Sequence, residues 1–166
     1  MGATAVAIDF KPVALEAVLY VQGKMTVGAG NKAGDLLESM GLSYLCVAAE
    51  RTVTKDYEKY KKESFLRLVA AAAEAAGCGN CGEQAATAFV YLLDKGIRPL
   101  DLMALEKPGD HNFVVIGRVS GSDVKDPATW GPTAIVCDAW EEKAYDPNLL
   151  FKMWHYKSWV VHRAEV

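Results

Sequence analysis

The stretch GCGNCGEQAA, residues 77–86, separates an alanine-rich helical pattern from a second, strongly apolar one. Asn80 is a residue type that favours the N-cap of a helix, and Glu83, three residues later, completes the spacing of a capping box. This spacing places Cys81 at the first helical position, where unpaired backbone N–H groups and the helix dipole favour a thiolate. The stretch predicts either a nucleophilic cysteine or a tight loop with two small buried thiols before a core helix.

Length and charge limit the class of protein. The chain has 166 residues and a formal net charge of −3. This length suits one domain with its own core, so residues 1–166 are expected to form a single domain. The charge argues against a nucleic-acid partner, and no apolar run approaches the ~20 residues of a membrane span.

The N-terminal segment and the cysteines indicate the cellular compartment of the protein and the redox state of its thiols. Residues 1–12 lack the basic and long apolar regions of a signal peptide, so synthesis in the cytoplasm is expected. A domain of this size does not need disulfides, so the four cysteines are expected to be reduced thiols. Cys46 and Cys137 are expected to lie in the core.

Helical periodicity dominates the first half of the chain. One helix, interrupted near Gly41, is expected within residues 32–50, and a clearer one over residues 54–76. A helix over residues 81–95 is apolar nearly all round, so it should be buried, with Cys81 at the floor of a cleft. Residues 12–21 fit a short helix or a strand, and residues 5–10 an edge strand.

Period-two patterns follow Gly96. Strands are expected over residues 112–119, 133–139 and 157–164, with a short helix between Asp146 and Trp154. Residues 98–105 contain a proline and are interpreted as a connector. Helices followed by an antiparallel sheet predict the α+β class.

Two polar residues on these strands suit the chemistry of Cys81. His111 begins the first strong strand, and Asp138 lies near the end of the next. Neighbouring strands can hold a histidine and an aspartate side by side, and a helix N-terminus packed on the sheet can supply the thiol. Cys137 should face the opposite side of its strand from Asp138.

Other arrangements of the same residue types remain open. Cys78 and Cys81, with His111 and Cys137, could supply four zinc ligands, although the second pair is widely spaced in the chain. A thioredoxin-like redox motif would require a preceding strand, and here a helix precedes it. We expect neither a metal nor a cofactor.

Three further residues compete for roles in the site. His162 is a rival for the base, and His155 is expected to serve packing. Asp110 could hold His111 in place of Asp138, but adjacent strand residues face opposite ways.

The ordered motifs resemble a known superfamily. GNCGE around Cys81, a histidine entering an apolar strand at His111, and CDAW at residues 137–140 resemble papain-like and transglutaminase-like cysteine enzymes. They are especially similar to the compact papain-like domains of bacterial toxins and secreted effectors. The resemblance covers residues 77–140. It implies N-terminal helices, including a buried nucleophile helix, packed on a C-terminal antiparallel sheet.

The resemblance also implies an activity. Cys81 would be the nucleophile, His111 the general base and acid, and Asp138 the orienter of a hydrolase that acts on a protein amide through an acyl-enzyme. Such an enzyme is a protease or a glutamine deamidase. The alternative is a non-enzymatic module, either tied by zinc or an inactive descendant.

The biological setting is implied in the same way. A toxin or effector would act on a protein substrate, have a cognate immunity or inhibitor protein, and reach its target cell through a specialised secretion system. The chain would then be the C-terminal toxin part of a longer protein.

The sequence departs from this superfamily near the nucleophile. Papain has a glutamine six residues before its cysteine, where this chain has Ala75. The oxyanion donors are therefore expected from the first turn of the helix, at Asn80, Cys81 and Gly82, with Gln84 as a further donor. Gly82 replaces the tryptophan of transglutaminases, which argues against cross-linking. Trp140 is expected to shield the site from water.

Overall fold

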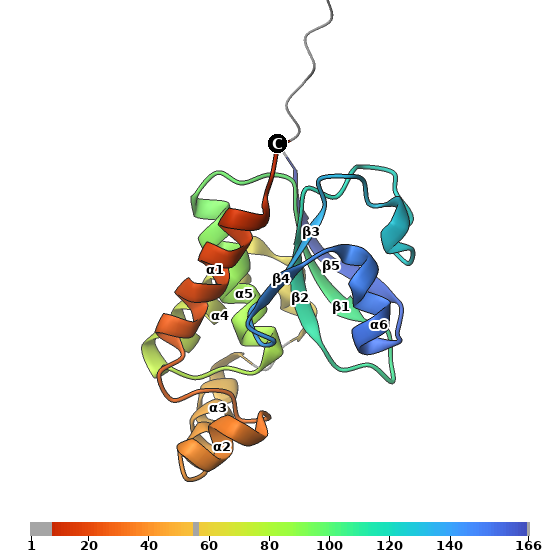
Figure 1. Ribbon diagram of the computed structural model, residues 1–166. Coiled ribbons are helices and arrows are strands. Elements are labelled where there is room, and N and C mark those ends of the chain that lie inside the picture. The colour runs from red at the N-terminus through yellow and green to blue at the C-terminus, as the bar shows by residue number, and fades with distance from the viewer. Residues whose placement is uncertain (1–7, 55–56, 166) are drawn as a thin grey trace, which may run out of the picture.

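The computed structural model describes residues 8–54 and 57–165. Helices from the first half of the chain cover one face of a five-stranded antiparallel sheet formed by the second half (Figure 1). A short helix, α6 (Leu150–Trp154), lies on the other side of the sheet. The predicted α+β class, with helices packed on a C-terminal antiparallel sheet, is confirmed.

The N-terminal half is helical. The elements are α1 (Lys11–Lys24), α2 (Ala33–Glu38), α3 (Leu42–Thr54), the 3₁₀ helix η1 (Tyr57–Lys61), α4 (Glu63–Ala76) and α5 (Cys81–Asp94). The single helix expected over residues 54–76 is wrong, because the backbone of Lys62 is extended and separates η1 from α4. Residues 12–21 are helical. Residues 8–10 form no strand, and the rest of the expected edge strand lies outside the described residues.

The strands run in the order β4-β3-β2-β1-β5. They span β1 (Leu100–Leu105), β2 (Asn112–Ile116), β3 (Ile135–Asp138), β4 (Lys143–Tyr145) and β5 (Ser158–Ala164). The connector expected over residues 98–105 is therefore wrong, since most of it is β1, which pairs with both β2 and β5. Its apolar residues face both sides of the sheet, so they do not alternate with polar ones.

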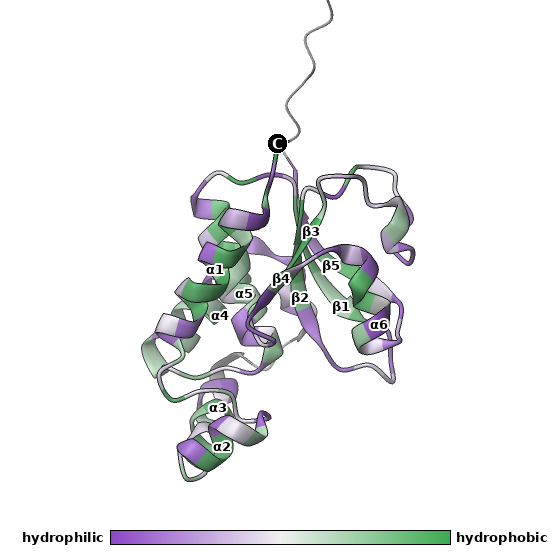
Figure 2. Ribbon diagram, viewed as in Figure 1, coloured by the Kyte–Doolittle hydropathy of each residue, from purple (hydrophilic) through white to green (hydrophobic). Residues whose placement is uncertain are grey.

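Two apolar cores lie on opposite faces of the sheet. On the helical face, α5 is buried along most of its length and packs with α1 and α4 against Leu102, Val114 and Cys137. On the other face, Trp130 and Phe113 form a second cluster with Leu150. Figure 2 shows hydrophobic residues concentrated in the strands and along the helices that face them. The buried position predicted for residues 81–95 is confirmed.

A disulfide joins Cys46 of α3 to Cys78, so the expectation of four reduced thiols is wrong. The packing of α3 against α4 brings Cys46 beside the turn that follows α4, with 6.1 Å between the two Cα atoms. That separation lies within the usual range for a disulfide. Cys46 is half-buried rather than in the core, whereas Cys137 is fully buried as expected. Cys81 and Cys137 are the free thiols.

Candidate active site

The turn before α5 sets the position of Cys81. Gly77 ends α4 in the left-handed conformation that glycine favours, and Asn80 is extended as the N-cap of α5. The backbone N–H of Asn80 donates to Glu83 Oε2 at 2.9 Å, as the capping-box spacing predicts. Cys81, only 7% exposed, is therefore held in the first helical turn, where backbone N–H groups lack helical acceptors.

The carboxylate of Glu83 would oppose a nearby thiolate if its charge were not balanced. Arg51 of α3 donates to both of its oxygens, at 2.8 and 3.0 Å. Glu83 is buried, so this bidentate pair neutralises the only acidic residue in the first turn of α5. Sequence reasoning missed Arg51, because it lies on a different helix and no local pattern links it to Glu83.

His111 connects the thiol to a carboxylate. Its Nε2 lies 2.8 Å from Asp138 Oδ2. The Cys81 side chain lies near enough to His111 to help raise the pKa of the imidazole. Because Nε2 faces Asp138, Nδ1 is the nitrogen left for the thiol. The structure thus brings together the three residues singled out from the sequence, from the N-terminus of α5, the start of β2 and the end of β3.

Asp138 is fully buried and held on both oxygens. Tyr145 of β4 donates its hydroxyl to Oδ2 at 3.2 Å, and the backbone N–H of Glu141 donates to Oδ1 at 3.1 Å. Burial and the charge of Asp138 raise the pKa of the Tyr145 hydroxyl, so it remains a donor. The sequence pointed to Asp138 but not to Tyr145, since β4 is too short to show a strand pattern.

The environment of His111 favours its charged form. Burial of the imidazole acts to lower its pKa, but hydrogen bonds with Asp138 and Cys81 outweigh it and raise the pKa from 6.5 to about 9. At neutral pH the ring is therefore an imidazolium that can stabilise a thiolate and later donate a proton.

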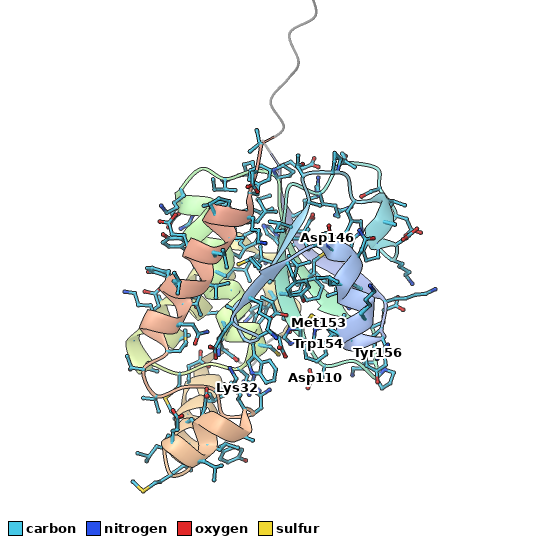
Figure 3. All side chains as sticks on the ribbon, viewed as in Figure 1. Lys32, Asp110, Asp146, Met153, Trp154 and Tyr156 are labelled. Atoms are coloured by element: carbon cyan, nitrogen blue, oxygen red, sulfur yellow. A yellow bond between two sulfur atoms is a disulfide. The ribbon has the colours of Figure 1, made fainter. Side chains whose placement is uncertain are left out.

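Aromatic side chains enclose this imidazole. Trp154 of α6 stacks on the ring of His111, with 4.1 Å between centroids, and Trp140 meets it edge-on at 5.6 Å. Trp140 also donates its Nε1–H to Asn31 Oδ1 at 2.9 Å. Figure 3 shows Trp154 and Asp110 at the lower end of the sheet, with Lys32 to their left, on the side of α2 and α3. Trp140 thus contacts the imidazole of His111, and its role as a shield against water stays a prediction.

Two of the oxyanion donors expected from the sequence are already engaged. The side-chain N–H of Gln84 donates to the Gly79 carbonyl at 2.8 Å, and the backbone N–H of Asn80 donates to Glu83. Both groups stabilise the turn before α5, and the oxyanion role of Asn80 and Gln84 stays a prediction. The backbone N–H groups of Cys81 and Gly82 remain suitable by position.

Gln22, in the last turn of α1, is a further amide donor near the site. Its Nε2–H₂ group donates to the carbonyl of Ala139 at 2.6 Å, one residue beyond Asp138, and lies 3.5 Å from Gln84 Oε1. Sequence reasoning missed it, because Gln22 begins a glycine-rich stretch, residues 22–31, that is typical of a loop, whereas α1 continues to Lys24.

The zinc site and the rival histidines considered from the sequence have other surroundings in the structure. Cys78 is in the disulfide and Cys137 faces the helical core, so neither joins Cys81 and His111 in a zinc site. Within residues 8–54 and 57–165, no group of three potential metal ligands is found. His162 bonds to the carbonyl of Lys61 instead, and His155 is exposed rather than packed.

Comparison of the chain with known protein families, curated proteins and solved structures yields no match. In the part of the chain that the structure describes, no helix is both long and apolar enough to cross a membrane.

Proposed function

We propose that the protein is a cysteine-dependent hydrolase, of the papain-like or transglutaminase-like kind, that acts on protein amides. The observation that carries the proposal is the bond of His111 to the buried carboxylate of Asp138, with the thiol of Cys81 near enough to raise the pKa of the same imidazole. A thiol, a base and a residue that orients the base form the arrangement that activates a nucleophile. The resemblance of the motifs at residues 77–140 to this superfamily points the same way.

The proposed reaction follows from these contacts. In the resting site the proton of Cys81 already resides on His111, and the thiolate of this ion pair attacks the carbonyl carbon of an amide. Backbone N–H groups at the start of α5 stabilise the oxyanion. His111 then gives its proton to the nitrogen as the C–N bond breaks, and an acyl-enzyme remains on sulfur. Water, deprotonated by His111, attacks this thioester and releases the carboxylic acid and the free thiol.

The leaving group separates two activities with the same first steps. Release of ammonia from a glutamine side chain makes the enzyme a deamidase, and release of a peptide amine makes it a protease. Both fit the residues of the site.

The proposed setting is that of a bacterial toxin or secreted effector with a protein substrate and a cognate inhibitor. The Cys46–Cys78 disulfide supports passage through an oxidising compartment, where disulfides persist.

The test is incubation of the protein with a mixture of unfolded and folded glutamine-containing proteins, followed by peptide mass spectrometry. Conversion of glutamine to glutamate identifies a deamidase, and new chain termini identify a protease. Either product should vanish in Cys81→Ala and in His111→Ala but persist in Cys137→Ala. Failure to form a product, together with ordinary reactivity of Cys81 toward thiol reagents, would instead favour an inactive binding module.

A further inference from the structure

The helical hairpin formed by α2 and α3 carries an unusual surface. Its apolar tip consists of five large side chains that are 58–89% exposed: Leu37, Met40, Leu42, Tyr44 and Leu45. None of the residues of α2 is buried. Figure 1 shows this hairpin projecting from one end of the stacked helices, away from the sheet. Clustered exposed apolar side chains mark interaction sites in soluble proteins.

The hairpin is attached to the candidate active site at several points. The disulfide fixes Cys46 to Cys78, three residues before Cys81, and Arg51 pairs with Glu83, two residues after it. On the other side, Lys32 donates to the Trp140 carbonyl at 3.1 Å. The apolar tip is therefore presented by a braced element, which limits the entropy cost of binding there.

Charge beside the tip restricts what can bind. A hollow of about 560 Å³ adjoins it and shares Leu42 with it. The ionisable side chains that line this hollow are all carboxylates, from Asp35, Glu38 and Glu142. Asp35 accepts from the Ala29 N–H, Lys32 pairs with Glu142, and Glu38 is exposed to solvent.

We propose that the apolar tip and this acidic hollow together dock a protein segment that presents apolar side chains beside lysine or arginine. A second copy of the chain is a poor occupant, because a two-fold interface would bring like carboxylates together. An anionic lipid surface is disfavoured by the same charges. A segment that carries both basic and apolar side chains complements the acidic hollow as well as the apolar tip. This docking surface goes beyond the proposed function and does not depend on the chemistry of Cys81.

The probe is a fluorescent synthetic helical peptide with leucines along one face, flanked by lysines. The matched control peptide has glutamates in place of the lysines. Binding is measured by anisotropy to the Cys81→Ala protein, so that no reaction interferes. We expect saturable binding of the lysine peptide, weaker at higher salt, and much weaker binding of the glutamate peptide.

Variants locate the binding. The double change Leu37→Ser with Met40→Ser, and the single change Glu38→Lys, should each weaken binding of the lysine peptide by at least about tenfold. Leu19→Ser is the matched control, because Leu19 is 71% exposed on α1, outside the hairpin, and it should bind unchanged.

Several results would overturn the docking surface. They are absence of binding, equal binding of the two peptides, or unchanged binding in the hairpin variants. Association of the chain with itself, or with phosphatidylcholine vesicles, that disappears in the Leu37/Met40 variant would assign the tip to another occupant.

Discussion

Two buried carboxylates of the same sheet have opposite surroundings. Asp101 of β1 is bound by two arginines: Arg118 Nε lies 2.8 Å and Arg163 Nη1 2.6 Å from its Oδ2. Asp138 of β3 is bound by the Tyr145 hydroxyl, a backbone N–H and the imidazole of His111. Both side chains are fully inaccessible to solvent.

The difference lies in the partners. Arginine stays charged at all ordinary pH values, so Asp101 forms a fixed ion pair that joins β1, β5 and the segment that follows β2. Histidine gains and loses a proton near neutral pH, so Asp138 holds a group that can transfer one. Burial of a carboxylate therefore does not by itself indicate a reactive site. For Asp138 the proposal rests on its partner His111 and on the nearby thiol of Cys81.

The largest expected effect is on stability, at Asp101. Asp101→Asn leaves two arginines without their buried counter-charge, which should lower the free energy of unfolding by about 3–5 kcal/mol. Urea denaturation measures this change. Alkylation of Cys81 in the folded variant should match the parent protein, and a large fall in that rate would mean that the two carboxylates are not functionally distinct.

Stability should also depend on pH through His111. Its pKa in the folded protein, about 9, lies above the ordinary 6.5, so the stabilisation is complete below pH 6.5 and is lost as pH rises through about 9. The loss should reach up to about 3 kcal/mol. Denaturation at a series of pH values should show it in the parent protein and not in His111→Gln. The same slope in both proteins would show that other groups cause it.

The next effect is on reactivity, at Asp138. Asp138→Asn removes the negative charge that favours the imidazolium, so alkylation of Cys81 near neutral pH should slow by about a hundredfold. Asp101→Asn is the matched control, because it makes the same chemical change on the same sheet. Equal rates in the two variants would contradict the role given to Asp138.

Tyr145→Phe should have the smallest effect. It deletes one hydrogen bond to Asp138 while the ring keeps its packing, so the free energy of unfolding should fall by about 1 kcal/mol. Cys81 should still react faster than Cys137. A loss of reactivity as large as that of Asp138→Asn would move Tyr145 from a supporting to a central role.

The sequence predicted the parts of this arrangement that have local patterns. The capping spacing at Asn80 and Glu83 placed Cys81, and strand alternation placed Cys137 and Asp138 on opposite faces of β3. Asp101 and its strand, β1, were missed. The apolar residues of β1 face both cores, so the strand does not show the alternation of apolar and polar residues.

Contacts between distant segments could not be predicted. These contacts depend on how α3 and α1 pack against the rest of the protein, and residue spacing within one segment carries no information about that packing. They pair Cys46 with Cys78, Arg51 with Glu83, and Gln22 with Ala139. The general expectation that a domain of this size lacks disulfides failed for the same reason.

The most direct test compares the two free thiols. Burial and the nearby charge of Asp138 raise the pKa of Cys137, whose thiol donates to the carbonyl of Ala14, whereas Cys81 lies near His111 and helps raise the pKa of the imidazole. Alkylation by iodoacetamide at a series of pH values from about 5 to 9, followed by mass spectrometry, measures the reactivity of both thiols in one sample. The account predicts that Cys81 reacts rapidly already near pH 6, that Cys137 does not, and that His111→Ala removes the difference at low pH. A Cys81 that reacts only at alkaline pH, at the same rate with and without His111, would contradict it.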